Sequence, residues 1–368
     1  MTHALKAIAL IFGLSVSNAF ANEGAYLDPA YKNLVHPIVN DLENKDGFSV
    51  SKTEDLIAKM TPVKSQASRG TCSIFSGIAL LEAMLVIKKD FPLDTDLSEE
   101  YLEYLIMRTS TGEGSSSWAN FNAIRRHGVP TEKTFPYLGI TWDEDTTTPL
   151  AIERCGSYTG NKKKSCLLGH RSPDLLAASE QQLNGQAEGN LLYDPEFLNA
   201  RTEAVTFRNK FVRFTSTSYS LWSTSQAKQF LIAGTPLTMG IEFYYGAWNH
   251  SKAPTYNIGR DNEAWANGLV GFPEAGSADA IESPKHRAGH SILIVGYDDD
   301  KIVETTVKMA DGSMKTFKYR GVYYFKNSWG TGSFGRNFTL GDTNYPGYGM
   351  ITQKYAHQYG SFYRMPLK

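Results

Sequence analysis

Two residues of the sequence have side chains and positions suited to nucleophilic attack on an amide. Cys72 lies at the predicted start of an apolar helix, six residues after Gln66. A thiolate is stabilised at such a place, because the N–H groups and aligned dipoles of a helix N-terminus favour negative charge. The thiol also needs a base, and His290 is the histidine that opens the strand-like segment HSILIVGY.

Asn327 closes a second strand-like segment, GVYYFKN. If the two segments pair antiparallel, the start of one lies beside the end of the other, so we expect His290 and Asn327 to be neighbours. Such an amide accepts from one ring nitrogen and fixes the tautomer, which leaves the other nitrogen for Cys72. Trp329 is expected to cover that hydrogen bond. Gln66 is expected to donate, with the backbone N–H of Cys72, to the oxyanion of a tetrahedral intermediate.

Three helices are predicted in the first part of the chain. The segment 72–89 is apolar on nearly every face and carries a single acid, so we expect a buried central helix. A second helix is predicted after Ser98, an N-cap residue that is followed by acidic residues in the first turn. A third is predicted from 117, ending at Gly128 as its C-cap.

The second part of the chain has strand signals instead. Segments rich in β-branched and aromatic residues lie at 204–214, 236–245, 290–298, 301–309, 314–320 and 321–327. Asp311-Gly312 is a strong hairpin turn between two of them. Because helices come first and a sheet follows, we predict an α+β fold of two lobes, with a cleft where the lobes meet.

Three motifs carry a resemblance to a known family. PVKSQASRGTCSIFS, AGHSILIVGYD and YYFKNSWGTG resemble the cysteine, histidine and asparagine segments of papain-like cysteine peptidases, the papain and cathepsin family, and they occur in the family's order. LSEEYLEYL and VPTEKTFPYLG resemble further landmarks of that family. The resemblance runs discontinuously from about Thr61 to Met350 and is that of a divergent, exported member of bacterial type.

The resemblance implies a papain-like two-lobe fold, with a helical lobe, a β-barrel-like lobe and the active-site cleft between them. It implies Cys72 as nucleophile, His290 as general base and later acid, Asn327 as orienting amide and Gln66 as oxyanion-hole donor. The reaction would be peptide-bond hydrolysis through a thioester acyl-enzyme. Trp329 would border the bound substrate.

Other positions follow from the same resemblance or depart from it. Gly112 and Gly114 fall where the family places glycines that pair with the substrate backbone. The family often has a cysteine where Arg69 stands and a tryptophan where Ser73 stands, so a usual disulfide is missing. A second tryptophan of the asparagine segment is replaced by Phe334. These departures are expected to alter the shape of the cleft rather than the chemistry.

The distance between the nucleophile and the histidine predicts insertions. Cys72 and His290 are separated by 218 positions, which is more than is usual for the family that the chain resembles. We expect insertions around 143–205 and 248–285. They are interpreted as loops that cap the cleft or bind a partner.

Residues 1–21 are predicted to be a signal peptide. They contain Lys6, an apolar run from Ala7 to Val16 and the small-x-small sequence that ends at Ala21. An N-terminal anchor helix is the alternative, although the run is short for a membrane span. The mature protein is expected to be secreted or periplasmic and to have no contact with the membrane after signal removal.

The rest of the chain is divided into a leader and one domain. Residues 22–60 are interpreted as a short leader, either a pro-region that keeps a zymogen latent or an N-terminal extension of the mature lobe. The peptidase-like domain is 61–368, and its predicted parts are a helical lobe at about 61–142, an insertion at about 143–205 and a β lobe at about 206–368.

Export makes disulfides possible, and two of the three cysteines lie close together. Cys155 and Cys166 are in a polar, turn-rich stretch suited to a small closed loop, so we predict that they are bonded to each other. Two unrelated thiols, or a metal site that adds His170, are the alternatives. A disulfide would leave Cys72 as the odd cysteine, and this needs a reason in an oxidising compartment.

The charge balance narrows the classes of partner. Lys+Arg number 37 against Asp+Glu 38, and the basic residues are scattered, so nucleic acid is not an expected partner. Peptides or proteins are the expected substrates, with no cofactor and no metal. Two other functions stay open at this point: a thiol amidase or deamidase acting on cell-wall or other amides, and a non-catalytic binding protein that retains the fold.

Overall fold

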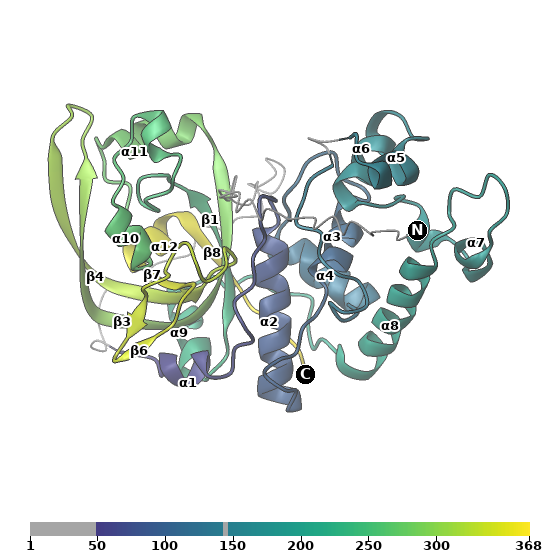
Figure 1. Cartoon of the computed structure of the whole chain (residues 1–368). Helices are drawn as coiled ribbons and strands as arrows, with labels where there is room; N and C mark the ends of the chain where they lie inside the picture. Colours follow the sequence, from purple (N-terminus) through teal and green to yellow (C-terminus); the bar gives the residue numbers. More distant parts are fainter. Residues whose placement is uncertain (1–48, 143–145) are drawn as a thin grey trace, which may run out of the picture.

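The computed structural model of the chain describes residues 49–142 and 146–368, so the predicted signal peptide and most of the predicted leader lie outside the described residues. Figure 1 shows two lobes side by side, with helix α2 (Cys72–Lys89) at their junction. One lobe is helical and comes first in the chain. The other is built on a sheet and holds most of the C-terminal half, so the predicted α+β, two-lobe class is confirmed.

The helical lobe contains the predicted helices and the predicted insertion. Its helices are α2 (Cys72–Lys89), α3 (Glu99–Met107), α4 (Ser117–His127), α5 (Pro149–Cys155), α6 (Gly160–Gly169), α7 (Glu180–Asn184) and α8 (Pro195–Phe211). The side chain of Ser98 caps α3 by accepting from the backbone N–H of Tyr101. Gly128 ends α4 at a φ of 74°, a conformation that glycine adopts without strain.

Helix α2 is buried because both lobes pack on it. Its residues from Cys72 to Leu85 are almost all inaccessible to solvent, which explains why the sequence shows no polar stripe. The helix ends at Asp90, which adopts a left-handed conformation at a φ of 54°. In the last turn, the Lys88 ammonium donates to the carbonyl of Leu367 at 2.6 Å, which holds the C-terminal segment of the chain against this helix.

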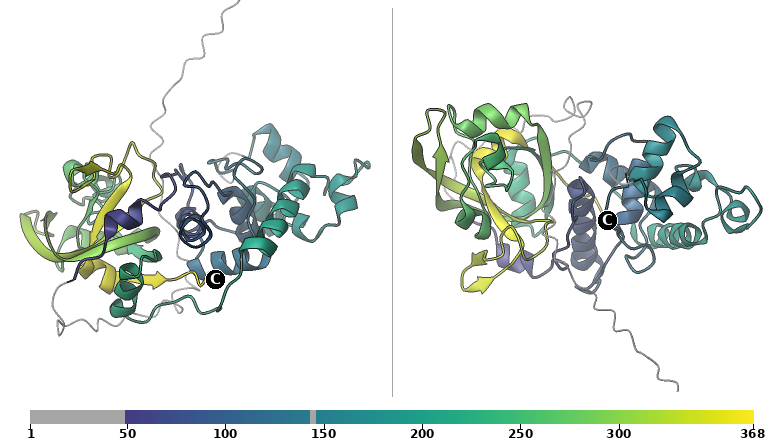
Figure 2. Two further views of the ribbon diagram at one scale, coloured as in Figure 1. Left: turned by 90° about the horizontal axis from the view of Figure 1, so that it is seen from below. Right: turned by 45° about the horizontal axis from the view of Figure 1, so that its top comes forward.

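The β lobe contains a six-stranded sheet with the strand order β2-β7-β4-β3-β1-β8. Its strands are β1 (Leu237–Phe243), β2 (Leu269–Val270), β3 (Ala288–Lys308), β4 (Met314–Lys326), β7 (Tyr348–Thr352) and β8 (Gly360–Tyr363). All described neighbours pair antiparallel except β2 and β7. The sheet curves around helix α12 (Gln353–Tyr359), as Figures 1 and 2 show.

Short elements complete this lobe. They are α1 (Thr53–Ile57), α9 (Thr224–Ile232), α10 (Asn262–Ala266), α11 (Ala278–Glu282) and the two-stranded pair β5 (Thr339–Leu340) and β6 (Thr343–Asn344). Single turns of 3₁₀ helix lie at Ala253–Tyr256 and Ser283–Lys285 in this lobe, and at Leu175–Ala177 in the helical lobe. Among the described residues, no helix has the length and apolar character needed to cross a membrane.

The strand predicted at 204–214 is wrong, because most of this segment belongs to helix α8. Asp194 caps that helix and Pro195 begins it, and both are favourable helix-start signals. Its buried positions are Phe197, Ala200 and Ala204, whose spacing is helical. The β-branched and aromatic residues nearer its end suggested a strand, but this N-terminal signal and the packing decide the structure.

The two strands predicted at 290–298 and 301–309 form one strand, β3, which is irregular between Asp298 and Ile302. Strand β4 likewise joins 314–320 and 321–327. The predicted hairpin turn at Asp311-Gly312 connects β3 to β4, with Gly312 at a φ of 85°. The chain therefore continues through places where the sequence indicated breaks.

Residues 49–60, which fall within the segment interpreted as a leader, pack on the β lobe. Ser51 exchanges hydrogen bonds with Tyr297: its backbone N–H donates to the carbonyl at 3.0 Å and its hydroxyl accepts from the N–H at 2.7 Å. Leu56, Ile57 and Met60 lie in the main hydrophobic core. This part of the chain is a structural element of the lobe.

Candidate active site

Cys72 is the first residue of helix α2 and is completely buried. The hydroxyl of the preceding Thr71 does not cap the helix; it lies 2.8 Å from the hydroxyl of Tyr137 instead. The positive end of the helix dipole therefore acts on the sulfur without a competing side-chain cap. Cys72 therefore lies at the helix start, as the sequence predicted.

His290 and Asn327 are brought together by the pairing of β3 with β4. The strands are antiparallel, with Leu293 opposite Lys326, so the start of one lies beside the end of the other. The Nε2 atom of His290 is 2.8 Å from the Oδ1 atom of Asn327. Since the amide oxygen can only accept, Nε2 carries the hydrogen and Nδ1 has the lone pair. Among the described residues, no hydrogen-bond partner is found for Nδ1.

Helix α2 and strand β3 are joined directly behind the candidate nucleophile and base. The hydroxyls of Ser76 and Ser291 are 2.7 Å apart. Ser76 lies one turn after Cys72 on the helix, and Ser291 follows His290 on the strand. The contact therefore brings the two backbones together beside the sulfur and the imidazole, across the junction of the lobes.

Burial sets the protonation state of the imidazole. The pKa of His290 is lowered from 6.5 to about 3 by burial, against the hydrogen bond to Asn327, which raises it; the charge of nearby His250 lowers it further. A lone imidazolium is therefore unstable here.

Aromatic rings enclose the histidine. Trp329 stacks on the His290 ring with centroids 4.5 Å apart and planes at 22°, in the place expected for a cover of the His290–Asn327 bond. Trp248 meets the same ring edge-on at 5.1 Å. Trp265 stacks on Trp329 at 5.4 Å. Water is thus kept from the bond that orients the imidazole.

Gln66 is fixed from both sides of its amide. Its backbone N–H donates to the carbonyl of Ser328 at 2.8 Å, and the Ser328 hydroxyl donates to its Oε1 atom at 2.7 Å. Its Nε2 group donates to the carbonyl of Arg69 at 2.6 Å. One of the two hydrogens on Nε2 is used in this way, which leaves the second for another acceptor. The side chain lies between the segment before Cys72 and the segment after Asn327.

The two glycines predicted to contact substrate lie in a loop before α4. Gly112 is exposed, with space beside its Cα atom, and Gly114 has a φ of 99°. Between them, the Glu113 carboxylate accepts from the backbone N–H of Gly70 at 2.6 Å. The glycine loop therefore lies against the turn that precedes Cys72. Ser115, the next residue, is 2.9 Å from Ser73 through their hydroxyls.

Cys155 and Cys166 are bonded to each other, as predicted, and join α5 to α6. They lie in a small hydrophobic cluster separate from the main core. Because both sulfurs are in this bond, the alternative metal site that adds His170 to the cysteine pair is not formed. Cys72 is not part of a disulfide.

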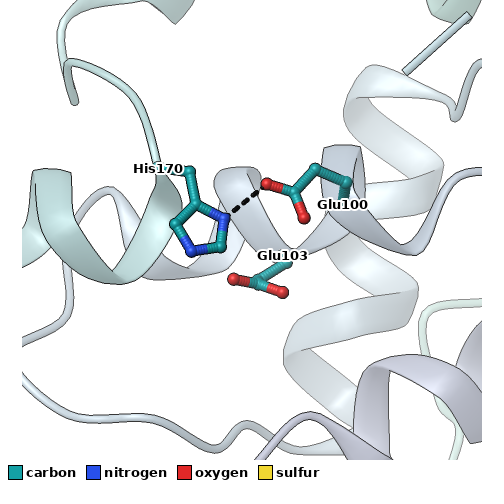
Figure 3. A group of neighbouring side chains, drawn as sticks. All are labelled: Glu100, Glu103 and His170. Carbon is teal, nitrogen blue, oxygen red and sulfur yellow. Dashed lines mark hydrogen bonds and ion pairs between the residues drawn. The ribbon is translucent and has the colours of Figure 1, made fainter. Parts of the chain in front are cut away.

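His170 belongs to another cluster. Figure 3 shows it beside Glu100 and Glu103, with Nδ1 of the ring 2.6 Å from the Glu100 carboxylate. These three side chains resemble a set of metal ligands. The Arg69 guanidinium, however, lies among them, 2.6 Å from Glu103 and 3.1 Å from Nε2 of His170. The arginine supplies the positive charge that a metal ion would otherwise bring.

Several residues that build this site were not predicted from the sequence. Trp248, His250 and Trp265 come from the predicted insertion after β1, and nothing in their local sequence indicated a place beside His290. Ser328 could have been found, because it follows Asn327 directly and carries a side chain able to bond an amide.

Comparisons with known proteins find similarities to cysteine proteases. The family described as papain family cysteine protease matches residues 50–188. Cysteine proteinase 2 of Entamoeba histolytica is 33% identical over 109 residues, 28% of this chain and 33% of that protein. Papain of Carica papaya is 31% identical over 85 residues, 22% of this chain and 23% of papain. The chain thus spans about a third of the length of the first relative.

Solved structures give distant similarities. Xylellain, a cysteine protease from Xylella fastidiosa, has a TM-score of 0.48 and 16% identity, covering 90% of this chain and 96% of xylellain. Digestive procathepsin L 3 of Tenebrio molitor has a TM-score of 0.44 and 17% identity, covering 94% of this chain and 77% of that chain. The family match ends before His290 and Asn327, so the roles of these two residues are argued from their geometry.

Proposed function

Since the chain belongs to the papain family of cysteine proteases through residues 50–188, we propose that it is an exported peptidase that hydrolyses peptide bonds with Cys72, His290 and Asn327. The observation that carries the proposal is the 2.8 Å bond between His290 Nε2 and Asn327 Oδ1. This bond leaves Nδ1 as the basic nitrogen of a ring that lies across the lobe junction from the start of helix α2.

The proposed reaction has two steps. In the first, the Cys72 sulfur attacks the peptide carbonyl while its proton passes to Nδ1 of His290. The oxyanion accepts from the backbone N–H of Cys72 and from Nε2 of Gln66. Nδ1–H then protonates the leaving amine, the C–N bond breaks, and a thioester remains.

In the second step, His290 removes a proton from water, and the hydroxide attacks the thioester carbonyl. The C–S bond breaks, the carboxylic acid leaves, and the thiol is restored. Asn327 holds the ring in one tautomer throughout, since its Oδ1 atom accepts from Nε2 in the neutral and the charged ring alike. Gly112 and Gly114 are proposed to pair with the substrate backbone, and Trp329 to border the bound chain.

The experiment that tests this function is digestion of a diverse peptide library by the purified protein, with products read by mass spectrometry. Cys72→Ala is the control for activity of the thiol. Cleavage by the wild-type chain and none by Cys72→Ala is the expected result. If the protein cleaved no peptide but acted on muropeptides or free glutamine, its activity would be that of an amidase or deamidase.

A binding protein that retains the fold would show neither activity. Iodoacetamide separates this case, because an active-site thiolate is alkylated quickly near neutral pH and an inert buried thiol is not. Rapid labelling at Cys72 is therefore expected, and its absence in a folded protein would contradict the catalytic proposal.

Export is proposed from residues 1–21, and latency from the leader. Because residues 49–60 pack into the β lobe, we place the end of any removable pro-region before Ser49 rather than at residue 60. N-terminal sequencing of the secreted or periplasmic active protein tests both points. A mature chain that starts at Asn22 with full activity would contradict the pro-region and leave the signal peptide supported.

A further inference from the structure

Arg69 is the most completely surrounded charged side chain near the candidate site. It is fully buried, and each nitrogen of its guanidinium has partners. Nε contacts the Glu113 carboxylate, while NH1 lies 3.0 Å from the Ile140 carbonyl and NH2 lies 2.8 Å from the Leu168 carbonyl. The remaining partners of the group are Glu103 and His170. A planar group with fixed donors is therefore locked in one orientation.

The His170 ring completes the pocket around the guanidinium. Nε2 of His170 lies 3.1 Å from NH1 of Arg69 and 2.9 Å from the Ile140 carbonyl, and Nδ1 lies 2.6 Å from the Glu100 carboxylate. Figure 3 shows how Glu100 and His170 face each other beside Glu103. The pocket comes from α3, from the residue that ends α6 and from the loop that carries Glu113. The arginine thus ties separate parts of the helical lobe to one point.

Arg69 itself belongs to the turn that leads into Cys72. The carbonyl of Arg69 accepts from Nε2 of Gln66 at 2.6 Å. One oxygen of Glu113 accepts from the backbone N–H of Gly70 at 2.6 Å, and its other oxygen contacts the Arg69 side chain. The same two residues therefore hold the backbone of the turn and the amide of Gln66. A shift of Arg69 would move both.

The turn needs such an anchor. Ala67 has a φ of 52°, a left-handed conformation that costs a non-glycine residue of the order of 1 kcal/mol. Gly70 lies so close to Glu113 that an added Cβ atom would be 3.0 Å from the carboxylate. Contacts with the charged side chains of Arg69 and Glu113 thus hold the backbone of the turn in a strained conformation.

We propose that Arg69 is a positioning residue for the oxyanion hole: with Glu113 it fixes the turn that aims the Gln66 amide. The inference rests on the proposed peptidase function. In this proposal an ion-pair network holds the turn. Arg69 stands where the family often has a cysteine.

The test compares two reactions of Cys72. A peptide aldehyde adds to the thiol and forms an oxyanion, so its affinity depends on the oxyanion hole. Iodoacetamide alkylates the thiolate by displacing iodide, and no oxyanion forms. Damage confined to the oxyanion hole lowers the first and spares the second, whereas general disruption of the site lowers both.

The variants are Arg69→Met, which removes the charge and keeps the length, and Glu113→Gln, which keeps an acceptor for Gly70. Loss of Arg69 leaves Glu103 buried without its cation. Burial already raises the pKa of Glu103 well above its usual value, against the effect of Arg69, so this carboxyl takes a proton rather than remaining an isolated charge. Glu113→Gln is the second variant if Arg69→Met fails to fold.

A matched control is Arg171→Met. Arg171 is another buried arginine of the helical lobe, paired with Asp194 and with Glu196 at 2.9 Å. Its loss costs stability without touching the turn. It should leave both reactions of Cys72 unchanged at a temperature well below unfolding.

For Arg69→Met and Glu113→Gln, we expect aldehyde affinity and kcat to fall about tenfold or more, against about 10²–10³ for the outright loss of an oxyanion-hole donor. The iodoacetamide rate should stay within about twofold. The double variant Arg69→Met/Gln66→Ala should lose little more than Gln66→Ala alone, because both changes act through one amide.

Two outcomes would overturn the inference: equal losses in both reactions, or losses of Arg69→Met and Gln66→Ala that multiply in the double variant. Wild-type protein that cleaves peptides and variants that match it would also reject the role of Arg69, leaving the function intact. Wild-type protein that neither cleaves peptides nor binds the aldehyde would instead reject the proposed function itself.

Discussion

Trp329 lies face to face with His290, with ring centroids 4.5 Å apart and planes at 22°. The indole therefore covers the imidazole that donates to Asn327 at 2.8 Å. A hydrogen bond shielded from water is stronger and better oriented than an exposed one. The outer face of Trp329 is in turn covered by Trp265 at 5.4 Å. The orientation of the base thus depends on rings from two separate segments of the β lobe.

Replacing this cover should weaken catalysis. We expect Trp329→Ala to lower kcat about tenfold, or about 1.4 kcal/mol, because water then competes for the His290–Asn327 bond and weakens it. Trp329→Phe should keep most of the activity, since a ring still covers the bond. Trp222→Ala is the control, because this tryptophan is 51% exposed. If Trp329→Ala and wild type were equally active on peptides, Trp329 would not be needed to shield the His290–Asn327 bond.

Changes at Asn327 should separate orientation from charge. Asn327→Ala removes the acceptor of Nε2–H, and we expect kcat to fall by roughly 10- to 100-fold, because a hydrogen bond to the charged ring is worth about 1.5–3 kcal/mol. Asn327→Asp keeps the acceptor and adds a negative charge beside the ring, which raises the pKa of His290. The pH profile of kcat/KM should then move to higher pH. If the pH profile of Asn327→Asp did not move, the contact with residue 327 would not control the pKa of His290.

The disulfide should matter for local stability and not for catalysis. Cys155 and Cys166 are separated by 11 positions, and closing a loop of that size stabilises a folded chain by about 3 kcal/mol in the chain-entropy view. We expect Cys155→Ala/Cys166→Ala to be cut faster by an added protease around α5 and α6. Its kcat on peptides should equal that of wild type. A large fall in kcat would mean that this insertion supports the cleft.

The sequence was informative where chemistry and local signals coincide. The N-terminal position of Cys72 on α2, the cap at Ser98 and the turn at Asp311-Gly312 are all marked by residue types whose effect is local. The approach of His290 to Asn327 followed from one assumption about antiparallel pairing, and the observed register agrees with it. These features need little knowledge of the rest of the chain.

Features set by long-range packing were not predictable in the same way. Helix α8 contains a run of β-branched and aromatic residues that favours a strand, and the burial of Phe197 and Ala204 decides for the helix. The surroundings of Arg69 come from segments as far away as Leu168. No spacing in the sequence shows that a buried arginine will meet a histidine and acids there, because the contact exists only after the helical lobe has folded.

The low pKa of His290 leads to a prediction for the chain without its thiol. In Cys72→Ala no thiolate can stabilise the imidazolium, and burial lowers the pKa of His290 from 6.5 to about 3. We expect the ring, followed by NMR of ¹⁵N-labelled histidine, to stay neutral far below pH 6.5. In wild type the thiolate should raise this pKa. A ring in Cys72→Ala that titrates near pH 6.5 would show that the site is open to water.

The same shift makes the stability of Cys72→Ala depend on pH. Below pH 6.5 the unfolded chain binds a proton at His290, while the folded chain does so only near pH 3. The folded state is therefore favoured less and less as the pH falls through this window, and His290 contributes up to about 1.4 kcal/mol per pH unit to the decline. Urea unfolding at several pH values between about 4 and 7 measures this free energy of unfolding. In Cys72→Ala/His290→Gln the free energy of unfolding should depend less steeply on pH. If both variants had the same dependence, His290 would already be charged in the folded protein.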